Sequence, residues 1–232
     1  KGNAGLITYM RTDSKNLSAE FVSDALDYVK NKLGEKYIVA GGRTFKKKSK
    51  LAQEAHEAIR PTDVQLVPEE IKEHLDSKQF KVYQLIWQRA VASQMSDAIT
   101  ETTSVGIEAK DTIWTLKTVG TVTKFAGWRA VYQSNGEDNE LPTLAIGDEL
   151  ELKTLDALQH FTSPPAQYSE AGLVKEMEKL GIGRPSTYAP TIATLVSRQY
   201  VDKVDKRLAP TEIAIIVIKL LVEHFSDIVD YN

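Results

Sequence analysis

The stretch SEAGLVKEMEKLGIGRPSTYAPTIATL, residues 169–195, predicts two short helices separated by a glycine turn. Ser169 is a suitable N-cap for the first helix, and Gly181 is a suitable residue to end it. Residues 200–210 then have the pattern of a small hairpin, and Thr211 is placed to cap an apolar helix that runs through Phe225. Helix, turn, helix and hairpin in this order are typical of a winged helix-turn-helix, which commonly binds nucleic acids. Two helices joined by a glycine turn also occur in many α-rich proteins, so this pattern alone leaves binding open.

The rest of the chain falls into two zones of different composition. Apolar residues recur at helical spacing over residues 18–33 and about 50–98, where Ser18, Gly34 and Pro68 mark helix ends. Residues 6–10, LITYM, predict a short strand that leads into a polar turn. Between about residues 100 and 162, short β-rich runs predict a small antiparallel sheet. Its expected strands are 102–109, 112–125, 128–133 and 149–161, with a turn at Asn135-Gly136.

These zones predict a multidomain α+β protein. We expect a mainly helical domain over residues 1–95, a β-rich segment over 96–165, and a helical, winged-helix-like segment over 166–232. The sequence begins with neither a methionine nor a signal-peptide pattern, so we expect it to be a piece of a longer chain.

Composition excludes several kinds of site. The chain of 232 residues has no cysteine, which excludes disulfides and thiolate metal ligands, and its four histidines form no closely spaced ligand pair. No run is long and apolar enough to cross a membrane, since the best candidate, residues 213–222, is interrupted by Lys219. A net charge of -3 means that contacts with nucleic acid would have to be local.

Tyr9 and Arg11 would share one face of the predicted strand, because side chains alternate along it. A phenol with a pKa near ~10 is a weak nucleophile at neutral pH, so it needs positive charge beside it. A guanidinium suits a phosphate because its planar fork matches two phosphate oxygens. The pair therefore suggests attack by Tyr9 on a phosphodiester, which would give a phosphotyrosine that allows resealing. Strand tyrosines more often serve in packing, and spacing alone does not decide between the two.

Three other groups of residues are candidates for contact with DNA. In AHEAIRPT, residues 55–62, a helix would stack His56 and Arg60 on one face. His56 could then supply a proton or a hydrogen bond to a phosphate, and Arg60 could clamp the DNA backbone. In GIGRPSTY, residues 181–188, Arg184 and the hydroxyls of Ser186 and Thr187 lie at a helix N-terminus, which favours anions. The third is a basic run that includes Lys46, Lys47 and Lys48. Taken alone, each group more often has an ordinary role, as a solvated loop, a salt-bridged helix residue or a helix cap.

Three of these stretches together resemble the bacterial type IA DNA topoisomerases. GLITYMRTDS is similar to that family's active-site tyrosine motif, AHEAIRPT to a second signature, and residues 169–195 to a third, in the family's order. The resemblance implies that Tyr9 forms a transient 5′-phosphotyrosine link and that Arg11 assists cleavage. It places His56 near the active site, and Arg184 and Thr187 in the groove that holds the DNA strand.

The same resemblance implies an enzyme that relaxes negatively supercoiled DNA by passing a strand through a transient break. Residues 1–95 would be the tyrosine-bearing domain, 96–165 part of a β-rich arch, and 166–232 part of the base that binds single-stranded DNA. The family's acidic Mg²⁺-binding Toprim domain would precede this sequence, so we expect no Mg²⁺ ligands here and no cleavage by this piece alone. A cytoplasmic, nucleoid-associated location follows from the family.

Two alternatives stay open at this point. Tyrosine recombinases and type IB topoisomerases also use tyrosine, arginine and histidine, although they place the tyrosine near the C-terminus. A winged-helix DNA-binding protein without catalysis would explain residues 166–232 but not the first 95.

Overall fold

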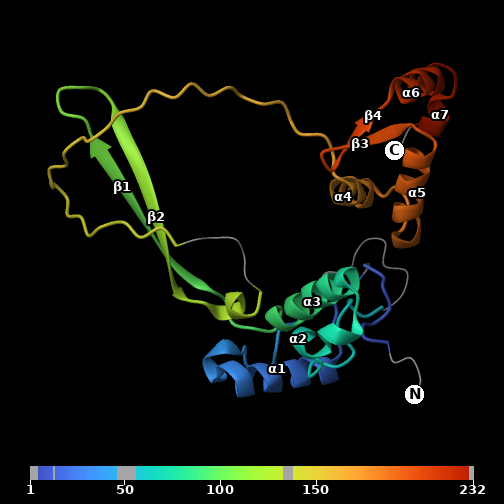
Figure 1. Ribbon diagram of the computed structural model, residues 1–232, viewed down its shortest axis with the longest axis horizontal. Coiled ribbons are helices and arrows are strands. Elements are labelled where there is room, and N and C mark those ends of the chain that lie inside the picture. The colour runs from blue at the N-terminus through green and yellow to red at the C-terminus, as the bar shows by residue number, and fades with distance from the viewer. Residues whose placement is uncertain (1–4, 13, 46–55, 133–137, 230–232) are drawn as a thin grey trace. The chain divides into compact units, whose positions relative to one another are not determined.

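The computed structural model describes residues 5–12, 14–45, 56–132 and 138–229. The chain divides into two compact units, Lys1–Glu151 and Leu152–Asn232. Both helices and small antiparallel sheets are present, as the sequence predicts (Figure 1). The predicted division at residues 95 and 165 remains a prediction. No helix in the described ranges is both long and apolar enough to cross a membrane.

The first unit is built around two amphipathic helices. Helix α1 (Ala19–Leu33) begins at Ser18, whose side chain accepts a hydrogen bond from the Phe21 N–H, and it ends at Gly34 with φ 102°. Helix α3 (Ser77–Ala92) begins with a capping box between Asp76 and Gln79. The shorter helices are η1 (Glu35–Tyr37), α2 (Pro68–Ile71) and η2 (Lys72–His74).

A small core joins these helices. Trp87 belongs to it; its ring meets Tyr28 edge-on, and its indole N–H donates to the Val64 carbonyl at 3.0 Å. The buried members of the core come from α1, α3 and the loops beside them: Phe21, Ala25, Val29, Val64, Tyr83, Trp87, Ala90, Val91 and Met95. Burial of this apolar surface fixes the loops that carry the candidate site.

The β-rich zone forms one long hairpin (Figure 1). Strand β1 (Ile99–Glu108) pairs antiparallel with β2 (Thr115–Phe125), and Asn139 adds an isolated bridge to Thr121. The strand predicted at 128–133 is wrong, since η3 (Gly127–Ala130) occupies its start. Gly127 turns the chain there with φ 49°, and the Trp128 N–H donates to the Ser96 carbonyl. The predicted Asn135-Gly136 turn lies outside the described residues.

The strand predicted at 149–161 is also wrong, because this segment has no regular secondary structure. Its alternating apolar side chains, such as Leu155 and Phe161, are 76% and 81% exposed. Alternation makes a segment suitable for a sheet, but a strand forms only where a partner supplies the hydrogen bonds.

The second unit follows the predicted winged-helix order. Helix α4 (Glu170–Leu180) is capped by Ser169 and ends at Gly181, and α5 (Pro185–Ser197) follows the glycine turn. Strands β3 (Val201–Val204) and β4 (Arg207–Pro210) form the hairpin, whose turn residues Asp205 and Lys206 both have positive φ. Thr211 caps α6 (Glu212–His224), and α7 (Ser226–Val229) comes last.

Candidate active site

The segment that carries Tyr9 is held against residues 60–62. The Thr8 N–H donates to the Arg60 carbonyl at 2.9 Å, the Thr62 N–H donates to the Leu6 carbonyl at 3.0 Å, and Ile7 forms an antiparallel bridge with Pro61. The predicted strand at 6–10 therefore shrinks to one bridge. The Thr8 hydroxyl adds two bonds, because it donates to the Ala58 carbonyl at 2.9 Å and accepts from the Arg60 N–H at 3.0 Å.

The helix predicted through His56 and Arg60 is wrong over the described residues 56–62, which are not helical. Their backbone groups bond to distant segments instead: the Ala58 N–H donates to the Asn16 carbonyl at 2.7 Å, and Arg60 pairs with Thr8. Pro61 also disfavours a helical conformation at the residue before it. His56 and Arg60 are consequently not stacked on one helical face.

Tyr9, Arg11 and His56 lie together all the same. The Tyr9 ring is 66% exposed, the guanidinium carbon of Arg11 is 5.7 Å from its centroid, and the His56 ring centroid is 6.1 Å away. A tight turn, closed by the Arg11 N–H donating to the Tyr9 carbonyl at 2.9 Å, brings Arg11 back over the ring. The two side chains converge as expected, through a turn rather than through strand alternation.

Two tyrosines of the core are poor candidates for a nucleophile. Burial and then the negative charge of Asp63 raise the pKa of Tyr83 to about 12, and its hydroxyl donates to the Leu66 carbonyl at 2.7 Å. Burial followed by the charges of Glu70 and Glu69 raises the pKa of Tyr28 as well. A raised pKa disfavours the phenolate form that a tyrosine nucleophile needs, so Tyr83 and Tyr28 are poorly suited to that role.

Arg60 is bound inside the protein rather than presented to solvent. Its guanidinium donates to both carboxylate oxygens of Glu57, at 2.6 and 3.0 Å, and its side chain is 14% exposed. It also stacks on the Phe21 ring at 4.8 Å. This geometry does not favour the DNA-clamping role that the sequence suggested for Arg60.

Glu57 is one of two residues beside the candidate site that sequence reasoning missed. Burial would raise the pKa of its carboxyl, but hydrogen bonds from Arg60 and from Ser18 hold that pKa below its ordinary value. The only signal in the sequence was the spacing of opposite charges at Glu57 and Arg60. Thr8 was missed too, because its partners lie some fifty residues away.

The second unit carries the other predicted contacts. Ser186 is exposed in the first turn of α5, and the exposed Arg184 donates from its guanidinium to the Gly183 carbonyl at 2.8 Å. The Thr187 hydroxyl accepts from the Arg184 N–H at 2.9 Å and donates to the Arg184 carbonyl at 3.0 Å. These three residues are thus neighbours at one helix end, while Lys46, Lys47 and Lys48 lie outside the described residues.

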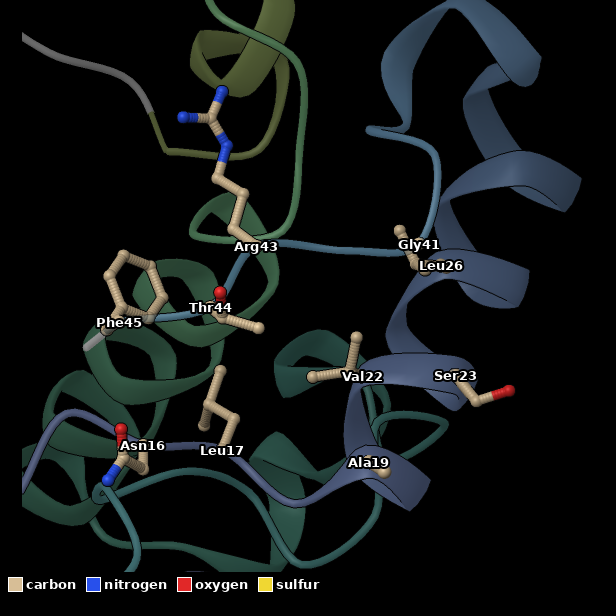
Figure 2. Close-up of a pocket in the computed structure, with 10 residues that line it drawn as sticks. All are labelled: Asn16, Leu17, Ala19, Val22, Ser23, Leu26, Gly41, Arg43, Thr44 and Phe45. Carbon is tan, nitrogen blue, oxygen red and sulfur yellow. The ribbon is translucent and has the colours of Figure 1, made fainter.

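A pocket of about 490 Å³ opens between α1 and residues 41–45 (Figure 2). Val22 and Leu17 make much of its wall apolar, and Figure 2 shows the guanidinium of Arg43 directed away from them. That guanidinium is bound to the Met95 carbonyl and to Asp97. Tyr9, Arg11 and His56 do not line this pocket, so it is separate from the candidate site.

The described residues contain no group of three or more His, Cys, Asp or Glu side chains that is arranged to hold a metal ion. Among the described residues near Tyr9, there is thus no cluster of side chains that would hold Mg²⁺.

Comparison with known proteins shows which family this chain resembles. A family model described as DNA topoisomerase matches residues 3–232. DNA topoisomerase 1 of Campylobacter jejuni is 45% identical over 99% of this chain and 33% of its own length. The Vibrio cholerae enzyme of the same name is 46% identical over 99% of this chain and 26% of its own length.

Similarity extends to a solved structure. Full-length topoisomerase I from Thermotoga maritima matches with a TM-score of 0.80 and 35% identity, over 98% of this chain and 36% of that one. The chain thus spans about a quarter to a third of the relatives it matches. The match runs through nearly every residue, which decides against a recombinase and against a free-standing winged-helix protein. The chain belongs to the bacterial type IA DNA topoisomerase family.

Proposed function

We propose that this chain supplies the nucleophile and part of the DNA-binding surface of a topoisomerase that cuts and reseals one DNA strand. The observation that carries the proposal is the exposed Tyr9 ring with the Arg11 guanidinium 5.7 Å and the His56 ring 6.1 Å from it. Names of relatives that match 99% of this chain support the same activity. Single-stranded and negatively supercoiled DNA are the proposed substrates.

In the proposed reaction, the Tyr9 oxygen attacks the phosphorus of a phosphodiester. The bond from phosphorus to the 3′ oxygen breaks, the phenol gives up its proton, and the 3′ oxygen takes one up. Arg11 offsets the negative charge of the phosphate, and His56 donates a hydrogen bond to it. Because the phosphotyrosine is itself a phosphodiester, attack by the freed 3′ hydroxyl reverses the step and reseals the strand without ATP.

Mg²⁺ is a further part of this proposal. It would be held by an acidic Toprim domain elsewhere in the parent polypeptide, since the described residues offer no metal-binding group of their own. We accordingly expect this chain alone to bind single strands weakly, through Arg184, Ser186 and Thr187, and not to cleave them. Cytoplasmic, nucleoid-associated action belongs to the same proposal.

A gel assay for covalent adducts tests the function. A labelled single-stranded oligonucleotide with Mg²⁺ should give no adduct with this chain alone and a denaturant-resistant adduct with the parent polypeptide. Protein attached to the 5′ end of the cut supports the proposal, whereas attachment to the 3′ end would support a type IB mechanism. Adduct formation by this chain alone would refute the proposal that cleavage needs a Toprim domain elsewhere in the parent polypeptide.

A further inference from the structure

We infer that the Glu57–Arg60 ion pair is a positioning unit that sets the distance between Tyr9 and His56. In this arrangement Arg60 does not bind DNA. The inference rests on the proposed function, since it assigns a supporting role to two residues beside the proposed nucleophile.

The pair is more than a surface salt bridge. Arg60 forms the two-pronged contact with Glu57 at 2.6 and 3.0 Å, and its other amino group donates to the Pro61 carbonyl at 2.9 Å. A weaker bond reaches the Ser18 hydroxyl at 3.3 Å. With Arg60 14% and Glu57 30% exposed, the pair is partly shielded from water, where charge-assisted bonds are stronger.

Both ends of the pair connect directly to the site. On one side, the Arg60 backbone exchanges hydrogen bonds with Thr8, the residue before Tyr9. On the other side, Glu57 follows His56 in the chain, and its carboxylate accepts from the Ser18 N–H at 2.7 Å. A shift of the pair therefore moves the backbone on either side of the Tyr9–His56 contact.

The pair also ties the site to the rigid part of the unit. The Ser18 hydroxyl that Arg60 reaches caps α1, and the Phe21 ring beneath the guanidinium is 2% exposed. Because core side chains are closely packed, this attachment resists small displacements. Catalytic groups that need such alignment lose up to ~100-fold in rate when they move by ~1 Å.

A phosphate clamp would require a different geometry. Among the described residues, four of the five N–H groups of the Arg60 guanidinium already bond to Glu57, Pro61 and Ser18. A phosphate approaching it would also meet the Glu57 carboxylate 2.6 Å from the Arg60 Nε. The negative charges of the phosphate and the Glu57 carboxylate would then repel each other.

The test compares two variants of the parent topoisomerase. Glu57→Gln keeps the shape of the side chain but removes its charge, and Arg60→Lys keeps the charge but removes the fork. The matched control is Glu35→Gln, which breaks an exposed pair with Lys30 in the same unit. Each protein is assayed for the rate of adduct formation at saturating single-stranded oligonucleotide, for its Kd, and for its melting temperature.

We expect both variants to slow adduct formation at least ~10-fold while the Kd changes less than ~2-fold. The double variant should lose no more than the worse single variant, because the two residues act as one unit. The control should match the wild type in all three measurements.

Two results would overturn the inference while leaving the proposed function intact. A clamp predicts that Arg60→Lys weakens binding and flattens its salt dependence, while Glu57→Gln tightens binding. A purely structural pair predicts a lower melting temperature with an unchanged adduct rate per folded molecule. A different result would refute the proposed function itself, and the inference with it: either the wild-type parent forms no adduct, or its adduct persists in the Tyr9→Phe variant.

Discussion

Tyr9 shows how one side chain is made available for chemistry without being part of the core. Its ring is 66% exposed, yet the residue before it makes three hydrogen bonds to residues 58–60. Thr8 thus holds the segment in place through its hydrogen bonds, while the next residue, Tyr9, is left exposed to solvent. Such a residue can be changed without disturbing the fold.

Replacing Tyr9 with phenylalanine in the parent enzyme tests this separation. The substitution removes one exposed oxygen, so relaxation and adduct formation should fall at least ~1,000-fold while single-strand affinity stays within ~2-fold. Relaxation of supercoiled plasmid and fluorescence anisotropy provide the two measurements. Loss of the melting transition in this variant would instead mean that Tyr9 serves packing.

Glu57 makes stability depend on pH in a defined direction. Its folded-state pKa lies below the ordinary value of 4.5, so the charged carboxylate stabilises the folded state. That contribution is complete well above pH 4.5 and is lost as the pH falls through the folded-state pKa. Urea unfolding at several pH values should show that Glu57→Gln costs most near neutrality and progressively less in acid. An equal cost at every pH would contradict this account.

At the scale of elements, the sequence predicted well those features that depend on residues close together in the chain. The caps at Ser18, Ser169 and Thr211 and the stops at Gly34 and Gly181 all depend on neighbours within one helical turn, and the structure confirms each. The β1–β2 and β3–β4 hairpins follow the same rule, because their strands are adjacent in sequence.

Errors arose where distant partners decide the structure. Residues 56–60 have a helical pattern, but hydrogen bonds to Thr8 and Asn16 replace the helical ones. For the same reason the sequence predicted the grouping of Tyr9 with Arg11 and missed both Thr8 and the contact of Glu57 with Ser18. Tyr9 and Arg11 are two residues apart, whereas Thr8 finds its partners about fifty residues along.

The cap of α3 gives a measurable prediction. The Asp76 side chain accepts from the N–H groups of Lys78 and Gln79, so Asp76→Ala should lower the free energy of unfolding by about 1 kcal/mol. Asp27→Ala on the exposed face of α1 is the control and should stay within about 0.5 kcal/mol of the wild type. Equal effects of the two changes in denaturant titrations would argue against the capping box.

Gly127, at the start of η3, should tolerate no side chain. Its φ is 49°, and an added Cβ would lie 2.4 Å from the Asp97 carbonyl oxygen. Gly127→Ala should therefore cost at least ~2 kcal/mol of unfolding free energy. Gly106→Ala in β1 is the matched control, because no atom lies within 4 Å of its added Cβ. Thermal and denaturant unfolding measure both, and a neutral Gly127→Ala would refute the close approach.

For the whole molecule, residues 152–168, the irregular start of the second unit, should be the weakest point. Its exposed Leu155, Leu158 and Phe161 suit chymotrypsin, and the segment has no regular hydrogen-bonded structure to resist cleavage. Brief digestion should cut first within residues 152–168 and leave two resistant pieces. Mass spectrometry identifies the sites, and first cuts inside α3 or the β1–β2 hairpin would contradict the division.

The hydroxyl of Thr187 has a chemical consequence for strand capture. It has one hydrogen, which it gives to the Arg184 carbonyl, and it accepts from the Arg184 N–H. Phosphate oxygens can only accept, so Thr187 can serve one only by releasing that carbonyl. Binding of a phosphate by Thr187 would then replace its hydrogen bond to the Arg184 carbonyl with one to the phosphate, so the net gain in affinity would be small. If this helix end binds DNA as we propose, the exposed Ser186, whose hydroxyl makes no hydrogen bond to Arg184 among the described residues, would be the readier donor to a phosphate.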